Sequence, residues 1–562
     1  MKQGKYFLAL AMAFMAYVPS AHSQKWVKKA RKAQVTVIAR TQDGQLRETQ
    51  GVFIDHEGTV VTDYDTMRDA IGASILDADG KEYPVECVAG ASALYNVSKL
   101  KAATNGKKTN FLELSGATHG DGTEVYVMPS PKSDKKAICQ TDTIARSEVF
   151  KEKFGYLTLG RQHTPNAAVM DAEGRLVGLV QPPAKEGAAT SYCMDAKYTA
   201  SLAVSALDAG NDDLKSIRIR KALPWKEDDA LTYIYLTAQK DTTFYRQYVE
   251  EFMERYPGNT SGYVAMAEYL VGKGDLQSAK STYDKALGNP ALKADEIHFS
   301  LSKTIYSLNS SPSYETFGDW DLGKSLAEAN AAYDSNPLPI YVNQQAECLY
   351  ALKRYAEAAD KFVSLAGTNL RSPEVFLYAV QCKKDAQAPQ EEIIALLDSA
   401  LSCYPTPYPV AAANTVIVRA KALADAGRYR EAVKGFNDFE HLNAGKVTAN
   451  FHYEREQLEI KCRMYPSALN DIESAIRLAP REPLYHAEAA SLNYRVNDIE
   501  QAIRHARQAT ELDDSFGDAH RILGVCLNQA GKRDEALRHL QRAVELGDTM
   551  AQGIIDRIKA GE

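Results

Sequence analysis

An interval of 34 residues near the C-terminus most constrains how this chain can fold. Two alanine series and one turn position recur at this interval: Ala468, Ala502 and Ala536; Ala475, Ala509 and Ala543; Pro480, Asp514 and Asp548. Sequence periods of about 20 to 50 residues are typical of arrays in which each repeat is one supersecondary unit stacked on its neighbours. The period therefore predicts a solenoid in the C-terminal part of the chain.

The spacing within one repeat indicates a pair of antiparallel helices. Positions 4, 7, 8 and 11 share one helical face, and small residues at positions 8 and 20 let two helices approach closely. Glycine at position 15 suits the left-handed backbone that ends a helix. One unit with this spacing contains Tyr263, Ala267, Leu270, Gly274, Ala279, Tyr283 and Ala286, and the last contains Leu523, Gly524, Leu527, Gly531, Ala536, Leu540 and Ala543. About eight or nine such units are predicted over residues 228–550.

These positions resemble the tetratricopeptide repeat family. The resemblance implies an all-α superhelical solenoid with a concave groove, lined by first-helix residues at positions 2, 5, 6 and 9. The paired Lys and Asn residues with which some members clamp a C-terminal carboxylate are not evident, so we expect another folded protein or an extended peptide as the partner. The candidate protein-binding residues in the groove are Asn343, Gln344, Glu347, Arg521, Ile522 and Val525.

Residues 25–208 have a different pattern of short apolar or β-branched runs separated by turns. Many short strands at this spacing predict an all-β barrel or a pair of barrels. The chain is thus expected to be multidomain, with residues 209–227 as a linker before the helical array. The predicted strands lie at Val35–Ile38, Gly51–Ile54, Thr59–Thr62, Ser74–Leu76, Glu124–Val127 and Leu176–Val180.

Three of these segments resemble trypsin-like serine proteases of the HtrA group. Gln50–Asp65 resembles the strand and turn that deliver the catalytic histidine, Asn96–Lys101 the segment that supplies the aspartate, and Asp171–Leu179 the strand pair after the nucleophile. The resemblance implies a trypsin-like double β-barrel over most of this domain.

The residue types of the catalytic triad are absent at the matching positions. Asp65 stands at the histidine position, Asn96 at the aspartate position and Pro165 at the serine position. Acyl transfer by a triad needs a hydroxyl, an imidazole that takes its proton and a carboxylate that orients the imidazole. The loop 163–168 also lacks the glycines that let backbone N–H groups form an oxyanion hole. We therefore expect an inactive pseudoprotease rather than an enzyme.

Two alternatives remain open at this point. A hydrolase of altered chemistry would need a new nucleophile and base, such as Thr164 with His163, although adjacent residues rarely face one another. A barrel without catalysis could still grip an extended peptide by strand addition. The other histidines and cysteines available for altered chemistry in this domain are His56, Cys87, His119, Cys139 and Cys193.

The N-terminus is typical of a secretory signal. Lys2 and Lys5 precede the apolar run Tyr6–Tyr17, and small residues follow in Ala21–Ser23, so residues 1–23 are predicted to be removed before Gln24. No later stretch approaches the roughly 20 apolar residues that a membrane span needs. The prediction is an exported protein, periplasmic or secreted, that acts in the cell envelope.

Charge and cysteine spacing exclude other classes of function. The net charge of -7 does not favour nucleic acid as a partner. The eight cysteines show no CxxC or Cys/His spacing of zinc sites, so neither a metal nor another cofactor is expected. Disulfides among Cys87, Cys139 and Cys193 stay open, with buried free thiols as the alternative. The sequence thus predicts a scaffold that binds proteins without catalysing a reaction.

Overall fold

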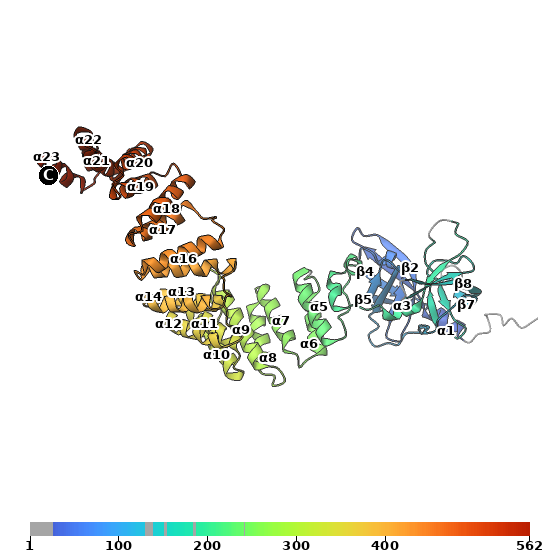
Figure 1. Ribbon diagram of the computed structural model, residues 1–562. Coiled ribbons are helices and arrows are strands. Elements are labelled where there is room, and N and C mark those ends of the chain that lie inside the picture. The colour runs from blue at the N-terminus through green and yellow to red at the C-terminus, as the bar shows by residue number, and fades with distance from the viewer. Residues whose placement is uncertain (1–25, 130–138, 151–153, 184–186, 241, 562) are drawn as a thin grey trace, which may run out of the picture. The chain divides into compact units, whose positions relative to one another are not determined.

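The computed structural model describes residues 26–129, 139–150, 154–183, 187–240 and 242–561 (Figure 1). The chain divides into two compact units, Met1–Ala286 and Leu287–Glu562. The predicted signal peptide, residues 1–23, lies outside the described residues. Within the described residues, no helix is both long and apolar enough to cross a bilayer.

A closed β-barrel forms the start of the first unit, as the strand pattern predicted. Its strands follow the order β1-β2-β3-β6-β5-β4, and all pairs are antiparallel. Valines and alanines on alternate positions of β1 point into the barrel, where Val35, Val37 and Ala39 are at most 2% exposed. The elements are α1 (Val27–Ala33), β1 (Gln34–Thr41), β2 (Leu46–Phe53), β3 (Thr59–Thr62), α2 (Tyr64–Met67), β4 (Ala70–Leu76), β5 (Glu82–Ser92) and β6 (Val97–Ala102).

A second sheet of six strands follows, in the order β11-β10-β7-β8-β9-β12. An antiparallel bridge between Val180 and Cys193 connects its two ends, so this sheet is also barrel-like. Both sheets contribute to one core, in which Val52 and Val61 pack with Tyr126, Met128 and Leu176. The elements are β7 (Glu124–Met128), β8 (Gln140–Phe150), β9 (Phe154–Leu159), β10 (Ala168–Met170), β11 (Leu176–Leu179), β12 (Tyr192–Met194) and α3 (Ala196–Ser201).

The segment expected to be a linker, 209–227, is largely paired with the first barrel. It contains the end of η2 (Ala206–Gly210) and all of α4 (Asp212–Ser216). The backbone of Val88 in β5 donates to Arg220 O at 2.8 Å and accepts from Ala222 N at 2.9 Å. The segment therefore forms hydrogen bonds with backbone groups of β5, whereas a flexible linker would leave those groups unpaired.

Helices make up the rest of the chain, as the repeat predicted. The left-handed backbone expected at position 15 is present at Gly274, Gly427 and Gly531, with φ of 76° to 78°. In the first unit they are α5 (Glu227–Lys240), α6 (Tyr245–Arg255), α7 (Thr260–Gly272) and α8 (Leu276–Leu287).

In the second unit, consecutive helices pack as hairpins from α9 with α10 to α21 with α22, and α23 packs on α22. The alanines Ala468, Ala502 and Ala536, which defined the period, are fully buried between paired helices. The helices are α9 (Ala294–Asn309), α10 (Leu322–Ser335), α11 (Pro339–Ala351), α12 (Tyr355–Ser364), α13 (Pro373–Asp385), α14 (Gln390–Leu401), α15 (Ala413–Asp425), α16 (Tyr429–Leu442), α17 (Ala449–Lys461), α18 (Tyr465–Leu478), α19 (Pro483–Arg495), α20 (Ile499–Leu512), α21 (Gly517–Gln529), α22 (Arg533–Glu545) and α23 (Ala551–Ala560).

Candidate functional site

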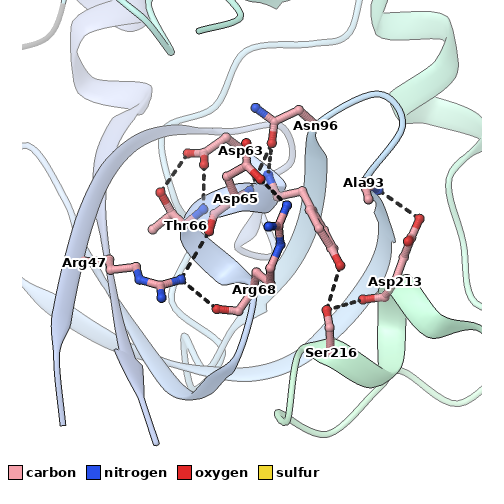
Figure 2. Close-up of polar contacts among 10 residues, drawn as sticks. Arg47, Asp63, Asp65, Thr66, Arg68, Ala93, Asn96, Asp213 and Ser216 are labelled. Atoms are coloured by element: carbon pink, nitrogen blue, oxygen red, sulfur yellow. Dashed lines mark hydrogen bonds and ion pairs between the residues drawn. The ribbon is translucent and has the colours of Figure 1, made fainter. Parts of the chain in front are cut away.

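Asn96, at the position matched to a catalytic aspartate, acts as a cap for the backbone of α2. Its Oδ1 accepts from the backbone N–H groups of Tyr64 and Asp65, both at 3.0 Å (Figure 2). Asn96 itself has a φ of 46°, a conformation that asparagine tolerates better than most residues. The Asp65 side chain is exposed and pairs with Arg68 at 2.5 Å. Neither residue therefore presents a group that could orient or replace a catalytic imidazole.

The buried carboxylate of Asp63 joins these positions to the loop of Pro165. Asp63 is 4% exposed, and its Oδ1 caps α2 by accepting from Thr66 N at 2.8 Å (Figure 2). Its Oδ2 accepts from Thr49 Oγ1 at 2.6 Å and from Asn166 Nδ2 at 2.9 Å. Asn166 directly follows Pro165, so the structure brings all three triad-matched positions around one hydrogen-bonded network.

The cavity beside this network is small. It has a volume of about 10 Å³ and lies between Asn96 and Asn166, lined further by Thr62, Gly178 and Met194. A volume of about 10 to 15 Å³ holds a single water molecule. A larger cavity of about 440 Å³ is lined by His163, Thr164 and Pro165.

Two clusters of serine, histidine and aspartate occur elsewhere in the first unit. Ser115 Oγ lies 2.9 Å from His119 Nε2 and donates to Asp171 Oδ2 at 3.0 Å. A catalytic triad places the imidazole between the hydroxyl and the carboxylate, whereas here the buried hydroxyl lies in the middle. The sequence does not indicate this cluster, because its members are up to 56 residues apart and form no known motif.

The second cluster turns His163 away from Thr164. His163 Nε2 contacts Asp142 Oδ2 at 2.6 Å, and both side chains are 4% exposed. Although burial opposes it, hydrogen bonding from His163 and two backbone N–H groups lowers the pKa of Asp142. The Ser191 Oγ accepts from the backbone N–H of His163 at 2.8 Å, not from its ring. The imidazole is therefore engaged in the interior while Thr164 is exposed.

The cysteines of the first unit are not activated nucleophiles. All eight cysteines of the chain are free thiols, and burial raises the pKa of both Cys87 and Cys139 to about 11. Burial also raises the pKa of Cys193. A thiol attacks as thiolate, which a raised pKa disfavours. Across the described residues, no hydrogen bond joins any two of His56, Cys87, His119, Cys139, His163 and Cys193, and no cluster of three or more metal-ligating side chains occurs.

The groove candidates in α11 are partly engaged with one another. Asn343 Nδ2 donates to Glu347 Oε1 at 2.7 Å, and both residues are partly exposed. Burial raises the pKa of Glu347. Gln344, in contrast, is only 3% exposed and donates to Cys348 Sγ at 3.5 Å. The prediction that Gln344 lines an open groove is therefore not supported, because its side chain packs inside the hairpin.

The candidates in α21 combine an ion pair with apolar surface. Arg521 Nε contacts Asp548 Oδ2 at 2.6 Å, and Arg521 Nη2 contacts Asp518 Oδ1 at 2.7 Å. Ile522 is partly buried against two neighbouring apolar clusters, and Val525 is partly exposed. These side chains form a small mixed surface with a guanidinium held in place by two carboxylates.

Part of the helical region is similar to a known repeat family. The tetratricopeptide repeat family model matches residues 487–551. The small glutamine-rich tetratricopeptide repeat-containing protein 2 of Mycosarcoma maydis is 33% identical over 73 residues, which are 13% of this chain and 21% of the relative. The match thus spans about a fifth of the length of that relative. Together with the 34-residue hairpins, the family match shows tetratricopeptide repeats within residues 487–551.

Several solved structures are similar to part of this chain. YrrB, described as a TPR protein with an unusual peptide-binding site, is 20% identical and covers 34% of this chain and 96% of its own, with a TM-score of 0.29. MamA from Desulfovibrio magneticus RS-1 is 19% identical and covers 31% of this chain and 94% of its own, with a TM-score of 0.28.

Proposed function

We propose that this protein is an exported, non-catalytic scaffold of the cell envelope, whose repeats bind other proteins or extended peptides. Tetratricopeptide repeats are protein-binding modules, and in this chain they continue through most of its length. The observation that carries the non-catalytic part is the network around Asp63, which occupies the space between the triad-matched positions.

We further infer that residues 25–208 form a degenerate trypsin-like double barrel. A closed six-stranded barrel precedes a second six-stranded sheet, in the chain order that the resemblance implies. Three positions far apart in sequence, Asp65, Asn96 and Pro165, come together at the meeting point of the two sheets. This convergence supports a common origin with enzymes whose triads lie between two barrels.

A hydrolysis assay tests the absence of catalysis. Purified full-length protein is expected to cleave neither casein nor model peptides, because the buried His163 is engaged by Asp142. Hydrolysis that persists in Pro165→Ala and disappears in Thr164→Ala would instead establish an enzyme of altered chemistry.

Site-specific crosslinking in the full chain tests where the partner binds. A photoreactive residue in place of Val525 or Glu347 is expected to capture the same envelope protein, while one in place of the exposed Leu46 on the barrel captures none. Capture from position 46 alone would assign binding to the barrel, as strand addition predicts, and overturn the role of the repeats.

A further inference from the structure

One hairpin of the array has an ionisable residue at each of the four first-helix positions that face its second helix. In α21 the positions that face the second helix of the hairpin, 4, 7, 8 and 11, carry one histidine and three small or apolar residues. The corresponding residues of α17, 68 positions earlier, are all ionisable. The α21 residues are His520, Leu523, Gly524 and Leu527, and the α17 residues are His452, Arg455, Glu456 and Glu459.

The four residues of α17 are buried to the same degree as a hydrophobic core. Their exposed fractions are 8% for His452, 7% for Arg455, 0% for Glu456 and 4% for Glu459. Asp471 of α18, which faces them, is 5% exposed. Arginine and glutamate are almost never buried to this degree without partners. The stability of the hairpin therefore depends on which of these five side chains have hydrogen-bond partners.

Part of this cluster is fully paired. Arg455 donates to both carboxylate oxygens of Asp471, at 2.6 and 2.7 Å, and to Glu440 of α16 at 2.7 Å. His452 Nδ1 contacts Asp471 Oδ1 at 2.8 Å. Arg455 is thus the one buried cation of the seam, and two carboxylates already neutralise it.

Glu456 and Glu459 have no such compensation. Gln457 donates to Glu456 Oε2 at 2.7 Å, but Glu456 Oε1 and Glu459 Oε2 have no hydrogen-bond partner among the described residues. Burial raises the pKa of both glutamates to about 8.

The carboxylates that face the two glutamates raise their pKa further, and one arginine opposes this at each glutamate. The nearby carboxylates of Glu488 in α19 and Asp471 in α18 raise the pKa of Glu456 further, and Arg495 in α19 opposes them. Around Glu459 the carboxylates of Asp471 and Glu456 raise the pKa, and Arg455 opposes them. Both side chains are therefore neutral acids in the closed hairpin at neutral pH.

We propose that the hairpin of α17 and α18 is a proton-dependent joint in the array, closed while Glu456 and Glu459 hold their protons and loosened when they ionise. Two additional negative charges in a buried seam that already contains Asp471 lack both solvent and counter-ions. Opening this hairpin changes the packing of α16 on α17 and of α18 on α19, which are in contact in the closed array.

The direction of the pH dependence follows from the two states. The closed hairpin keeps the protons up to about pH 8, whereas a glutamate in an open chain loses its proton near 4.5. The stability of the hairpin is thus greatest at low pH and decreases as the pH rises through this window. Any change in partner affinity with pH rests on the proposed function, but the opening of the joint does not.

Hydrogen exchange of the full chain, corrected for the intrinsic exchange rate at each pH, tests the joint directly. Between about pH 5.5 and about pH 8.5, amides of α17 and α18 are expected to lose protection at least tenfold, while those of α15 and α16, whose seam has no buried acid or histidine, keep theirs. Equal protection of α17 and α18 at both pH values would overturn the proposal.

Two variants separate ionisation from other effects of pH. The double variant Glu456→Gln and Glu459→Gln keeps the shape and removes the charge, so its protection should not depend on pH. Should the buried amides prevent folding, Glu456→Ala with Glu459→Leu installs an alanine and a leucine, as at Ala490 and Leu527 of later units. The exposed Glu511→Gln is the matched control and should retain the full response. A pH response that persists in a folded double variant would contradict the proposal.

Discussion

Replacement of Asn96 is expected to loosen α2 and the adjoining strands, because the side chain caps two backbone N–H groups. In Asn96→Ala the N–H of Tyr64, which is partly buried, loses its acceptor, while that of Asp65 can turn to water. A buried group left unsatisfied costs about 1–3 kcal/mol. Alanine at a φ of 46° adds about 1 kcal/mol of backbone strain. The expected loss for Asn96→Ala is thus about 2–4 kcal/mol.

Two further variants at the same position separate these contributions. Asn96→Gly removes the acceptor but relieves the backbone strain, so its free energy of unfolding should fall by about 1 kcal/mol less than that of Asn96→Ala. Asn96→Asp keeps an acceptor and tolerates the left-handed backbone, so it should remain within about 1 kcal/mol of the natural protein. The expected order of stability is Asn, Asp, Gly and Ala, from highest to lowest.

Hydrogen exchange with peptides covering residues 59–76 measures the local free energy without requiring the whole chain to unfold in two states. The exchange of α21 and α22 serves as the internal control, because it should be equal in all four proteins. If Asn96→Asp were as destabilised as Asn96→Ala, the cap would not be the source of the stability, and the structural role assigned to this position would be wrong.

Two other perturbations have expected signs that follow from packing and burial. A Cβ on Gly524 would lie 2.6 Å from Leu540 Cγ. Gly524→Ala should therefore lower the melting temperature, because overpacking reduces the free energy of unfolding by about 1–3 kcal/mol. Gly553→Ala, in an open helical position, should instead raise the free energy of unfolding by about 0.5–1 kcal/mol. Burial lowers the pKa of His505 and His539, so the protons that the unfolded segments bind below about pH 6.5 should reduce the hydrogen-exchange protection of α20 and α22 as the pH falls. Protection of these two helices that stays constant from about pH 7 to about pH 5 would contradict this.

The sequence predicted the repeats well because their determinants are local. Ala468, Ala502 and Ala536 are small where two helices touch, and this requirement recurs at a constant interval. The left-handed position 15 was recognised only where it is glycine. The same backbone occurs at Lys353, Gln387, Arg463 and Asn497, where the sequence has no glycine to indicate it.

The site could not be predicted to the same extent, because its contacts join distant segments. The triad-matched positions came from a resemblance, but the bond between Asn166 and Asp63 spans 103 residues and has no local pattern. Gln344 had the position of a groove residue, and only the packing around Cys348 shows that it is buried. Local spacing therefore placed residues on helices and strands, whereas tertiary packing decided which of them are accessible.

Polar pairs between position 4 and position 23 recur in three consecutive hairpins of the array, from α17 to α22. His452 with Asp471 lies 34 residues before His486 with His505, and the same interval leads to His520 with His539, whose Nδ1 atoms are 3.1 Å apart.

An earlier hairpin has Val416 and Gly435 at these positions, within a seam of isoleucine, leucine and phenylalanine. Protonation of His505 and His539 lowers stability toward acid, and ionisation of the glutamates of α17 lowers it toward alkali, so α17 to α22 should be most stable in a window between the two. The hairpin of α15 and α16 has no buried acid or histidine in its seam and should show no such window. Titration should therefore change the stability of α17 to α22 while that of α15 and α16 stays constant.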